Sequence, residues 1–214
     1  MNSRQACRAA YSELLTLLPT VDDDVGWRPT LCAGWSVRDL LFHLLCDAQR
    51  ALVALHTPAQ GPTDADAVTY WGSWQPGTPG AAAGLRGIRT VASAWTSVVS
   101  IADLYDETVR AVLVSAEERT AGELVRTQGK VLTVGSLLST LAVEATVHHL
   151  DLGLGQPTPL GLAEVRRTLD GLLGEPAPID DDTRYALVGT GRAPLTDAER
   201  RAIGPLSDRL PLFG

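Results

Sequence analysis

Residues 135–151 read GSLLSTLAVEATVHHLD, and this stretch decides the fold because it combines a buried helix with ionisable groups. Glu144 and His148 are four residues apart, so on a helix both side chains project from one face, about one turn apart. Asp151 adds a third polar group to that face. Ionised carboxylates are costly to bury unless they are paired or bind a metal. A Glu-x-x-x-His pair among Leu, Ala and Val therefore predicts metal ligands or an acid/base pair.

A second apolar helix is predicted from Val37 to about Leu55, with Ser36 as its N-cap and Asp39 completing a capping box. One polar stripe interrupts its apolar surface, because polar residues recur at i, i+4, i+7, i+8 and i+11. These residues are Asp39, His43, Cys46, Asp47 and Arg50. Two helices that each carry a narrow ionisable stripe can bury these stripes against each other, as metal sites in helix bundles do. We expect the rest of the chain to pack around this pair.

The spacing of apolar residues in the rest of the chain also predicts mainly helices. An amphipathic helix is predicted from Ser3 to about Leu18, and a long helix from about Ala82 to Ala116, interrupted or bent near Gly84 and Gly87. Long connections are predicted at residues 21–35 and 56–80. A short extended stretch is predicted at residues 130–133. Short helices are predicted at about 162–173, 183–188 and 197–203. The expected fold class is all-α, with a four-helix bundle over residues 1–155 and a short helical C-terminal extension over residues 156–214.

The composition fits one soluble domain. The chain has 214 residues, of which 45% are hydrophobic and 20% are charged, so neither a disordered nor a membrane-embedded chain is indicated. A net charge of -7 disfavours a protein that binds nucleic acid through its overall field. Neither a signal peptide nor a membrane span is apparent, and three scattered cysteines suit a reducing compartment. We expect a cytoplasmic monomer or homodimer with no nucleic-acid or membrane partner.

Three side chains of the two stripes form a candidate metal site. His43, Glu144 and His148 supply three protein ligands, which leaves a fourth zinc position open for water or substrate. That is the catalytic rather than the structural pattern, because an open zinc lowers the pKa of a bound water or thiol. Asp47 and Asp151 are interpreted as hydrogen-bond acceptors that orient the ligating imidazoles.

Other polar residues near the stripes have simpler interpretations. His149 lies about 100° around the helix from His148, so we expect it at the rim of the site or behind the ligands. Cys7, Cys32 and Cys46 are interpreted as small buried hydrophobic residues, although Cys46 lies one turn from His43 and is close enough to act as a ligand or nucleophile.

The long connection at residues 56–80 contains an aromatic cluster. Connections of this length in compact domains often form lids or pocket walls. The predicted wall of a substrate or thiol pocket consists of Arg38, Arg50, Tyr70, Trp71 and Trp74. No GxGxxG, GxxxxGK[ST] or GxSxG motif is present, which disfavours nucleotide binding and hydrolase-elbow chemistry.

Two segments together carry a family resemblance. Cys32-Ala-Gly-Trp-Ser-Val-Arg-Asp-Leu-Leu-Phe-His43, followed about 100 residues later by Glu144-x-x-x-His148-x-x-Asp151, resembles the mycothiol-dependent maleylpyruvate isomerase family. Its members are DinB-like four-helix bundles of actinobacteria. The two motifs are jointly specific, and the resemblance extends over roughly the first 155 residues.

The resemblance implies a zinc ion, or another divalent metal, held by His43, Glu144 and His148, through which these residues act in catalysis. The open position would be taken by water or by the sulfur of a small thiol, typically mycothiol. The thiolate would attack a small electrophilic metabolite, either as a nucleophilic cofactor in an isomerisation or as the group transferred. Members with isomerase activity have a larger α/β C-terminal domain, so the short helical segment after Leu160 favours an S-transferase or a specialised-metabolite tailoring enzyme.

Two alternatives keep the same bundle. In one, the site acts on a metabolite directly by Lewis-acid or acid/base catalysis, without a thiol. In the other, the chain is a non-catalytic binding module stabilised by its metal.

Overall fold

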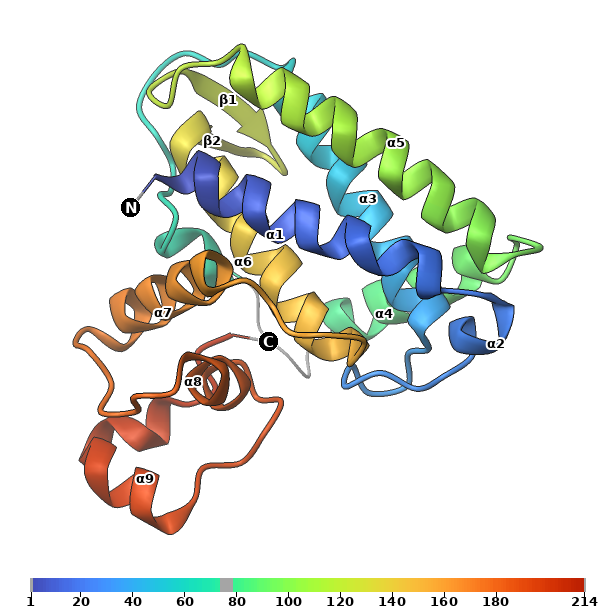
Figure 1. The fold of residues 1–214 in the computed structure, drawn as a ribbon. Coiled ribbons are helices and arrows are strands. Elements are labelled where there is room, and N and C mark those ends of the chain that lie inside the picture. The colour runs from blue at the N-terminus through green and yellow to red at the C-terminus, as the bar shows by residue number, and fades with distance from the viewer. Residues whose placement is uncertain (1, 74–78, 214) are drawn as a thin grey trace.

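Four long helices form the centre of the computed structural model, which describes residues 2–73 and 79–213 (Figure 1). They are α1 (Ser3–Leu17), α3 (Val37–Leu55), α5 (Val98–Glu117) and α6 (Val134–Leu152). Helix α1 packs on α6, α3 packs on α5, and α3 also contacts α6. The expected all-α fold, a four-helix bundle with a short helical extension, is confirmed.

Helix α6 is apolar on nearly all sides, and it is covered on nearly all sides. It contacts α1, α3 and α7 (Pro159–Leu173). Two of its buried hydroxyls bond within the helix, since Thr140 donates to the carbonyl of Leu137 and Thr146 to that of Ala142, whereas the hydroxyl of Ser139 accepts from Arg167 of α7. Thr133 caps its first turn, and Gly153 ends it in the left-handed conformation that glycine adopts without strain.

The start of α3 agrees with the prediction. The Ser36 side chain accepts from the backbone of Asp39, and the Asp39 carboxylate accepts from the backbone of Ser36, which is a complete capping box. The side chain of Asp39 therefore caps the helix, although Asp39 belongs to the polar stripe. Of the other stripe residues, His43 contacts His148 of α6, and Asp47 and Arg50 line a pocket together with residues of α6.

The predicted single helix from Ala82 to Ala116 is wrong, because two helices occupy this region. Helix α4 covers Pro79–Ala92, and α5 begins at Val98, so the chain leaves the helical conformation at residues 93–97. Ser97 caps α5, and the Asp23 carboxylate accepts from the Val98 backbone. The guanidinium of Arg38 donates to the carbonyls of Ala92 and Trp95. These distant partners stabilise the break.

The predicted extended piece at residues 130–133 is one strand of a hairpin. Strands β1 (Leu124–Thr127) and β2 (Lys130–Thr133) pair antiparallel, with Leu124 opposite Thr133. Gln128 and Gly129 form the two-residue turn with φ values of 48° and 78°, as type I′ turns require. Residues 57–59 run beside β1, so part of the long connection is fixed against the hairpin. The connection at residues 21–35 contains a short helix, α2 (Asp23–Gly26).

The C-terminal segment consists of α7, α8 (Asp182–Gly189) and α9 (Asp197–Ile203), which lie on one side of the bundle (Figure 1). They form a second apolar cluster around Leu169 and Tyr185, and Val143 and Val147 of α6 belong to this cluster. Helix α6 therefore contributes to two cores. The predicted helices at about 162–173, 183–188 and 197–203 are confirmed, with bounds that differ by a few residues.

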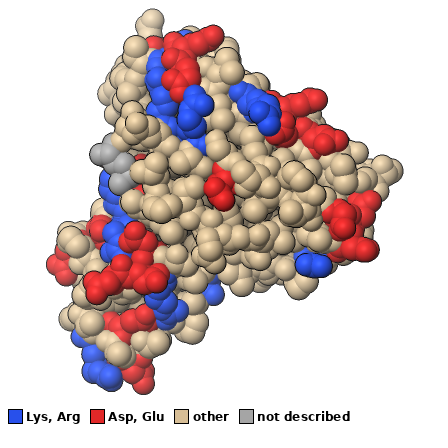
Figure 2. All heavy atoms as spheres, in the orientation of Figure 1, with Lys and Arg blue, Asp and Glu red and all other residues tan. Residues whose placement is uncertain are grey.

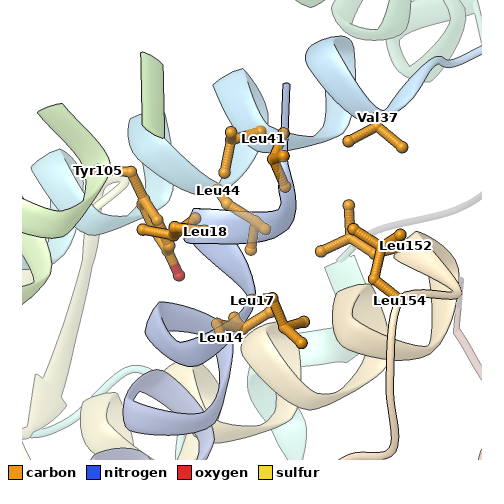
Figure 3. A pocket seen from close by; sticks show the side chains of 10 residues that line it. Leu14, Leu17, Leu18, Val37, Leu41, Leu44, Tyr105, Leu152 and Leu154 are labelled. Atoms are coloured by element: carbon orange, nitrogen blue, oxygen red, sulfur yellow. The ribbon is translucent and has the colours of Figure 1, made fainter. Parts of the chain in front are cut away.

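A small gap remains at one end of the bundle, between α1, α3, α5 and the segment that follows α6 (Figure 3). Its lining is leucine and valine apart from Tyr105, whose buried hydroxyl has no hydrogen-bond partner among the described residues. Burial raises the pKa of Tyr105 well above its usual value. We interpret this gap as imperfect core packing, because its walls offer a polar ligand almost nothing to bind.

On the face shown in Figure 2, acidic and basic side chains alternate over the C-terminal helices and at the far end of the bundle. They form no broad patch of one sign on that face. None of the helices in residues 2–73 and 79–213 is both long enough and apolar enough to cross a membrane.

The contact between α6 and α7 generates a stability prediction. A Cβ atom added at Gly161 would overlap Oγ1 of buried Thr146, so Gly161→Ala is expected to lower the free energy of unfolding by about 1–3 kcal/mol. The matched control is Gly87→Ala, where no atom lies within 4 Å of the added Cβ and the helix gains about 0.5–1 kcal/mol. Denaturant unfolding followed by circular dichroism measures both. Equal midpoints for Gly161→Ala and the wild type would contradict the close packing.

Candidate functional site

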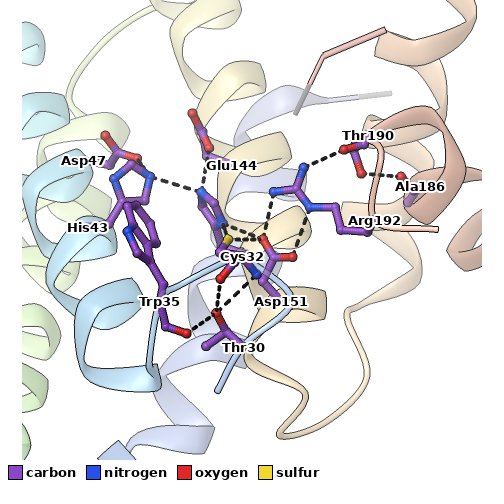
Figure 4. A network of polar contacts seen from close by, with 11 residues as sticks. Thr30, Cys32, Trp35, His43, Asp47, Glu144, Asp151, Ala186, Thr190 and Arg192 are labelled. Carbon is purple, nitrogen blue, oxygen red and sulfur yellow. Dashed lines mark hydrogen bonds and ion pairs between the residues drawn. The ribbon is translucent and has the colours of Figure 1, made fainter. Parts of the chain in front are cut away.

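Three ligand-type side chains meet where α3 crosses α6 (Figure 4). Nε2 of His43 lies 3.0 Å from Nε2 of His148, and the same nitrogen of His148 lies 3.2 Å from Oε2 of Glu144. All three ligand atoms lie within 4.8 Å of one another. Tetrahedral zinc with bonds of about 2.0–2.1 Å sets its ligand atoms roughly 3.4 Å apart. The separations therefore suit a single small cation.

The proton arrangement of His148 also suits a cation. Its Nδ1 lies 2.8 Å from Oδ2 of Asp151, so the Nδ1–H donates to a carboxylate and the Nε2 lone pair is directed at the other two ligands. A lone pair and a carboxylate oxygen do not attract each other without a positive charge between them. Either a proton on His148 or a metal supplies that charge.

The electrostatics of the three ligands agree with this arrangement. Burial lowers the pKa of His43 and favours its neutral, ligating form. Burial also opposes charge on His148, but its hydrogen bonds to the Asp151 and Glu144 carboxylates and its contact with Cys32 outweigh burial and raise the pKa of His148 well above its usual value. Despite burial, the contact with His148 lowers the pKa of Glu144. The cluster therefore favours a positive charge, and a divalent cation would compete with the proton for the same lone pair.

Asp47 lies at the edge of the site rather than behind it. Its Oδ2 lies 3.2 Å from Nε2 of His43, the nitrogen that faces the other ligands, so Asp47 does not contact the opposite ring nitrogen as an orienting acceptor would. That oxygen is buried and has no hydrogen-bond partner among the described residues. The other oxygen, Oδ1, accepts from Nη1 of Arg50 at 2.5 Å. An unpartnered carboxylate oxygen beside His43 is a second feature that fits a bound cation.

Asp151 joins three separate parts of the chain. Its side chain has no exposed surface, and its carboxylate accepts from His148 of α6, from Sγ of Cys32 at 3.1 Å and from two nitrogens of Arg192. Burial opposes its charge, yet the hydrogen bonds from His148 and Arg192 hold the pKa of Asp151 far below its usual range. It therefore stays an acceptor.

Neither Cys32 nor Arg192 was among the predicted site residues. Cys32 was interpreted as a small hydrophobic residue, but its sulfur contacts Asp151 and lies 4.0 Å from Nδ1 of His148. Cys32 is the first residue of the motif that carries the family resemblance, and this position in the motif could have indicated that it belongs to the site. Arg192 lies in the connection after α8, outside any helix, so helical spacing could not relate it to the polar stripes.

A small pocket opens beside the ligands. Glu144 and Asp47 line it together with other residues of α3 and α6, the hairpin and Tyr70. Among the described residues the lining consists of Asp47, Arg50, Ala51, Tyr70, Thr127, Gln128, Leu137, Thr140, Leu141 and Glu144. Arg50 and Tyr70 belong to the predicted pocket wall. Gln128 was not predicted, and its amide donates to the Tyr70 hydroxyl at 2.7 Å.

The other residues predicted for the pocket wall are not in this lining. Arg38 is buried, donates to backbone carbonyls of the α4–α5 break and stacks over Trp27 at 5.1 Å. Trp71 is buried in the second apolar cluster, where it stacks on Phe213 with ring centroids 4.4 Å apart. Trp74 lies outside the described residues.

His149 faces away from the ligand cluster. Its ring is buried beside Gly155, and its Nε2 has no hydrogen-bond partner among the described residues. Burial lowers its pKa, which favours the neutral ring. Cys46 is partly buried against the bundle core, and burial raises the pKa of its thiol. The metal-ligand groups found among the described residues contain neither of these two side chains.

Comparisons with known proteins show the family and the fold. Residues 7–153 match the family described as the mycothiol maleylpyruvate isomerase N-terminal domain. Two solved structures, of the mycothiol-dependent maleylpyruvate isomerase and of a mutant of it, are each 20% identical to the chain with a TM-score of 0.57, and each comparison covers 80% of this chain and 68% of the other. At this identity the likeness is one of fold. No curated protein matches the sequence. Because the family match spans well over half of the sequence, the chain belongs to the mycothiol maleylpyruvate isomerase N-terminal domain family, the enzyme family that its sequence resembles.

Proposed function

We propose that this protein is a metal-dependent enzyme that uses a mycothiol-type thiol to isomerise or conjugate a small electrophilic metabolite. The observation that carries the proposal is the convergence of His43, Glu144 and His148 beside a pocket, in a chain of this family. The related solved enzyme is mycothiol-dependent and is a maleylpyruvate isomerase, which supports a thiol as the cosubstrate.

The proposed metal ligands are His43, Glu144 and His148, and zinc suits two imidazoles and one carboxylate. When bound there, a divalent cation would lower the pKa of a coordinated thiol, so that the reactive thiolate form exists at neutral pH. Asp151 keeps the Nε2 lone pair of His148 available by accepting the proton of Nδ1. Three protein ligands leave an open position, and Glu144 borders both the ligand cluster and the pocket.

The pocket offers a polar substrate several partners. Arg50 is the cation in its lining, and 45% of its side chain is exposed while it holds Asp47. Thr127, Gln128 and Thr140 add hydroxyl and amide groups. We infer that this lining binds a carboxylate or another anionic group of the substrate or of the thiol, because a guanidinium binds such groups by paired hydrogen bonds.

Isomerase and transferase activity share one first step in this proposal. The thiolate sulfur adds to one carbon of an electron-poor carbon–carbon double bond, so that a carbon–sulfur bond forms while the π bond breaks and its electron pair moves onto the conjugated carbonyl group. If the adduct rotates about this former double bond and the electron pair returns to expel the thiolate, the product is an isomer and the thiol is regenerated. If the adduct instead takes up a proton and the carbon–sulfur bond persists, the product is a conjugate.

The proposal predicts turnover that requires both metal and thiol. Zinc-loaded protein, mycothiol and a panel that includes maleylpyruvate and other activated electrophiles are expected to give product, and omitting the thiol should abolish it. His43→Ala is expected to lower zinc affinity and kcat/KM by at least about a hundredfold, because one ligand is lost. His56→Ala is the matched control, since among the described residues the Leu52 carbonyl is the one hydrogen-bond partner of that exposed imidazole.

Full activity in His43→Ala, or wild-type protein purified without chelator that contains no metal, would overturn the proposal. Product formed at the same rate without any thiol would instead favour the direct Lewis-acid or acid/base alternative.

Metal removal distinguishes an enzyme from a metal-stabilised binding module. The bundle core is formed by apolar side chains of α1, α3, α5 and α6, so the metal-free protein is expected to stay folded with a cooperative thermal transition. Only the stabilisation from metal binding should be lost with chelator. Circular dichroism melting with and without chelator measures this, and a chain that unfolds on chelation would support the module instead.

The pocket lining makes a separate prediction about substrate binding. Arg50→Ala is expected to raise KM for the anionic partner about tenfold while zinc content stays at the wild-type level. Arg110→Ala is the matched control, because Arg110 also bonds an aspartate of its own helix, Asp106, but on the exposed face of α5. Steady-state kinetics with each substrate varied in turn measures the effect. Unchanged KM values in Arg50→Ala would exclude this role.

A further inference from the structure

We propose that Arg192, in the C-terminal extension, is a positioning residue of the metal centre. It fixes the carboxylate of Asp151, and through it the ring of the metal ligand His148. This inference rests on the proposed metal-dependent function and adds the extension to the machinery of that site.

The guanidinium of Arg192 is held on two sides (Figure 4). Its Nε lies 3.0 Å from Oδ1 of Asp151 and its Nη2 lies 2.9 Å from Oδ2, which is a bidentate pair. Its Nη1 donates to the Thr190 carbonyl at 2.9 Å, and the Thr190 hydroxyl donates to the Ala186 carbonyl in α8. Only 10% of the Arg192 side chain is exposed. The end of α8 therefore sets the position of this cation.

One oxygen carries the connection to the metal ligand. Oδ2 of Asp151 accepts from Nη2 of Arg192 and also from Nδ1 of His148, at 2.8 Å. The bidentate pair fixes the plane of the carboxylate, so Oδ2 stays in line with the imidazole N–H. Without Arg192, a carboxylate with no exposed surface would lose its compensating charge. The carboxylate would then be free to rotate, and the Nε2 lone pair of His148 would no longer be fixed toward the metal.

The backbone at Asp151 is held independently of Arg192. The amide of Leu31 donates to the Asp151 carbonyl at 3.1 Å, and Asp151 lies within the last turns of α6. Removing the guanidinium therefore affects the side chain of Asp151 before it affects the helix.

The position of Arg192 also disfavours metal binding at a second group of ligand-type side chains, which shares His148 with the first. Cys32, His148 and Asp151 have the ligand types and spacing of a metal site. However, the Arg192 guanidinium already neutralises Asp151, and Nδ1 of His148 points its proton at the same carboxylate. A cation placed there would face two groups that repel it.

The proposal is tested by zinc affinity in the full-length protein, measured by competition with a chromogenic chelator. Arg192→Ala is expected to weaken zinc binding about 10–100-fold, the usual effect of losing a group that orients a ligand. Millimolar guanidinium added to this variant is expected to restore part of the affinity. Arg184→Ala is the matched control, because Arg184 makes the same bidentate pair with Glu199 in the same extension, with both bonds at 2.7 Å.

Arg192→Lys provides a second variant in case Arg192→Ala does not fold. Lysine keeps the charge but cannot form the bidentate pair, so an affinity below that of the wild type is expected. Zinc affinity in Arg192→Ala or Arg192→Lys equal to that of Arg184→Ala overturns the proposal, and so does a loss that guanidinium fails to restore. Wild-type protein that binds no zinc overturns the proposed function itself, which is a different result.

Discussion

The structure around the site depends on the hydrogen bond between Asp151 and Nδ1 of His148. A carboxylate without exposed surface costs several kcal/mol unless positive or hydrogen-bonding groups compensate it. The compensation comes from three places in the chain: His148 in α6, Cys32 in the loop before α3, and Arg192 after α8. The need to neutralise one buried charge thus joins the bundle, the loop and the extension at a single point.

Helix α6 can carry this charge because its other faces are apolar. Val143 and Val147 belong to the cluster shared with the C-terminal helices, whereas Leu138 and Ala142 belong to the bundle core. Glu144 differs from Asp151, since 30% of its side chain is exposed and it borders the pocket. One helix therefore carries both the carboxylate that lines the pocket and the carboxylate that fixes the His148 ring.

The sequence was sufficient where the determining contacts are local. The bounds of α3 and α6 follow from caps and periodicity, and two matching polar stripes identified the His43, Glu144 and His148 group that the fold brings together. The single helix from Ala82 to Ala116 was wrong because its break is held by Asp23 and Arg38, which are remote in sequence. The contacts of Cys32 and Arg192 with Asp151 also join segments far apart in the chain, so spacing within a helix could not reveal them.

The pocket and the extension have different roles in this arrangement. Among the described residues, the pocket lining comes from α3, α6, the hairpin and Tyr70, and none of it comes from α7, α8 or α9. Gln128, which contacts Tyr70 there, sits at a positive φ of 48° that a two-residue hairpin turn requires. The hairpin turn presents Gln128 to the pocket, whereas the extension contacts the ligand cluster through the bond between Arg192 and Asp151. In the proposed function, changes in the hairpin would therefore alter which metabolite binds, and changes in the extension would alter how firmly the proposed ligand His148 is held.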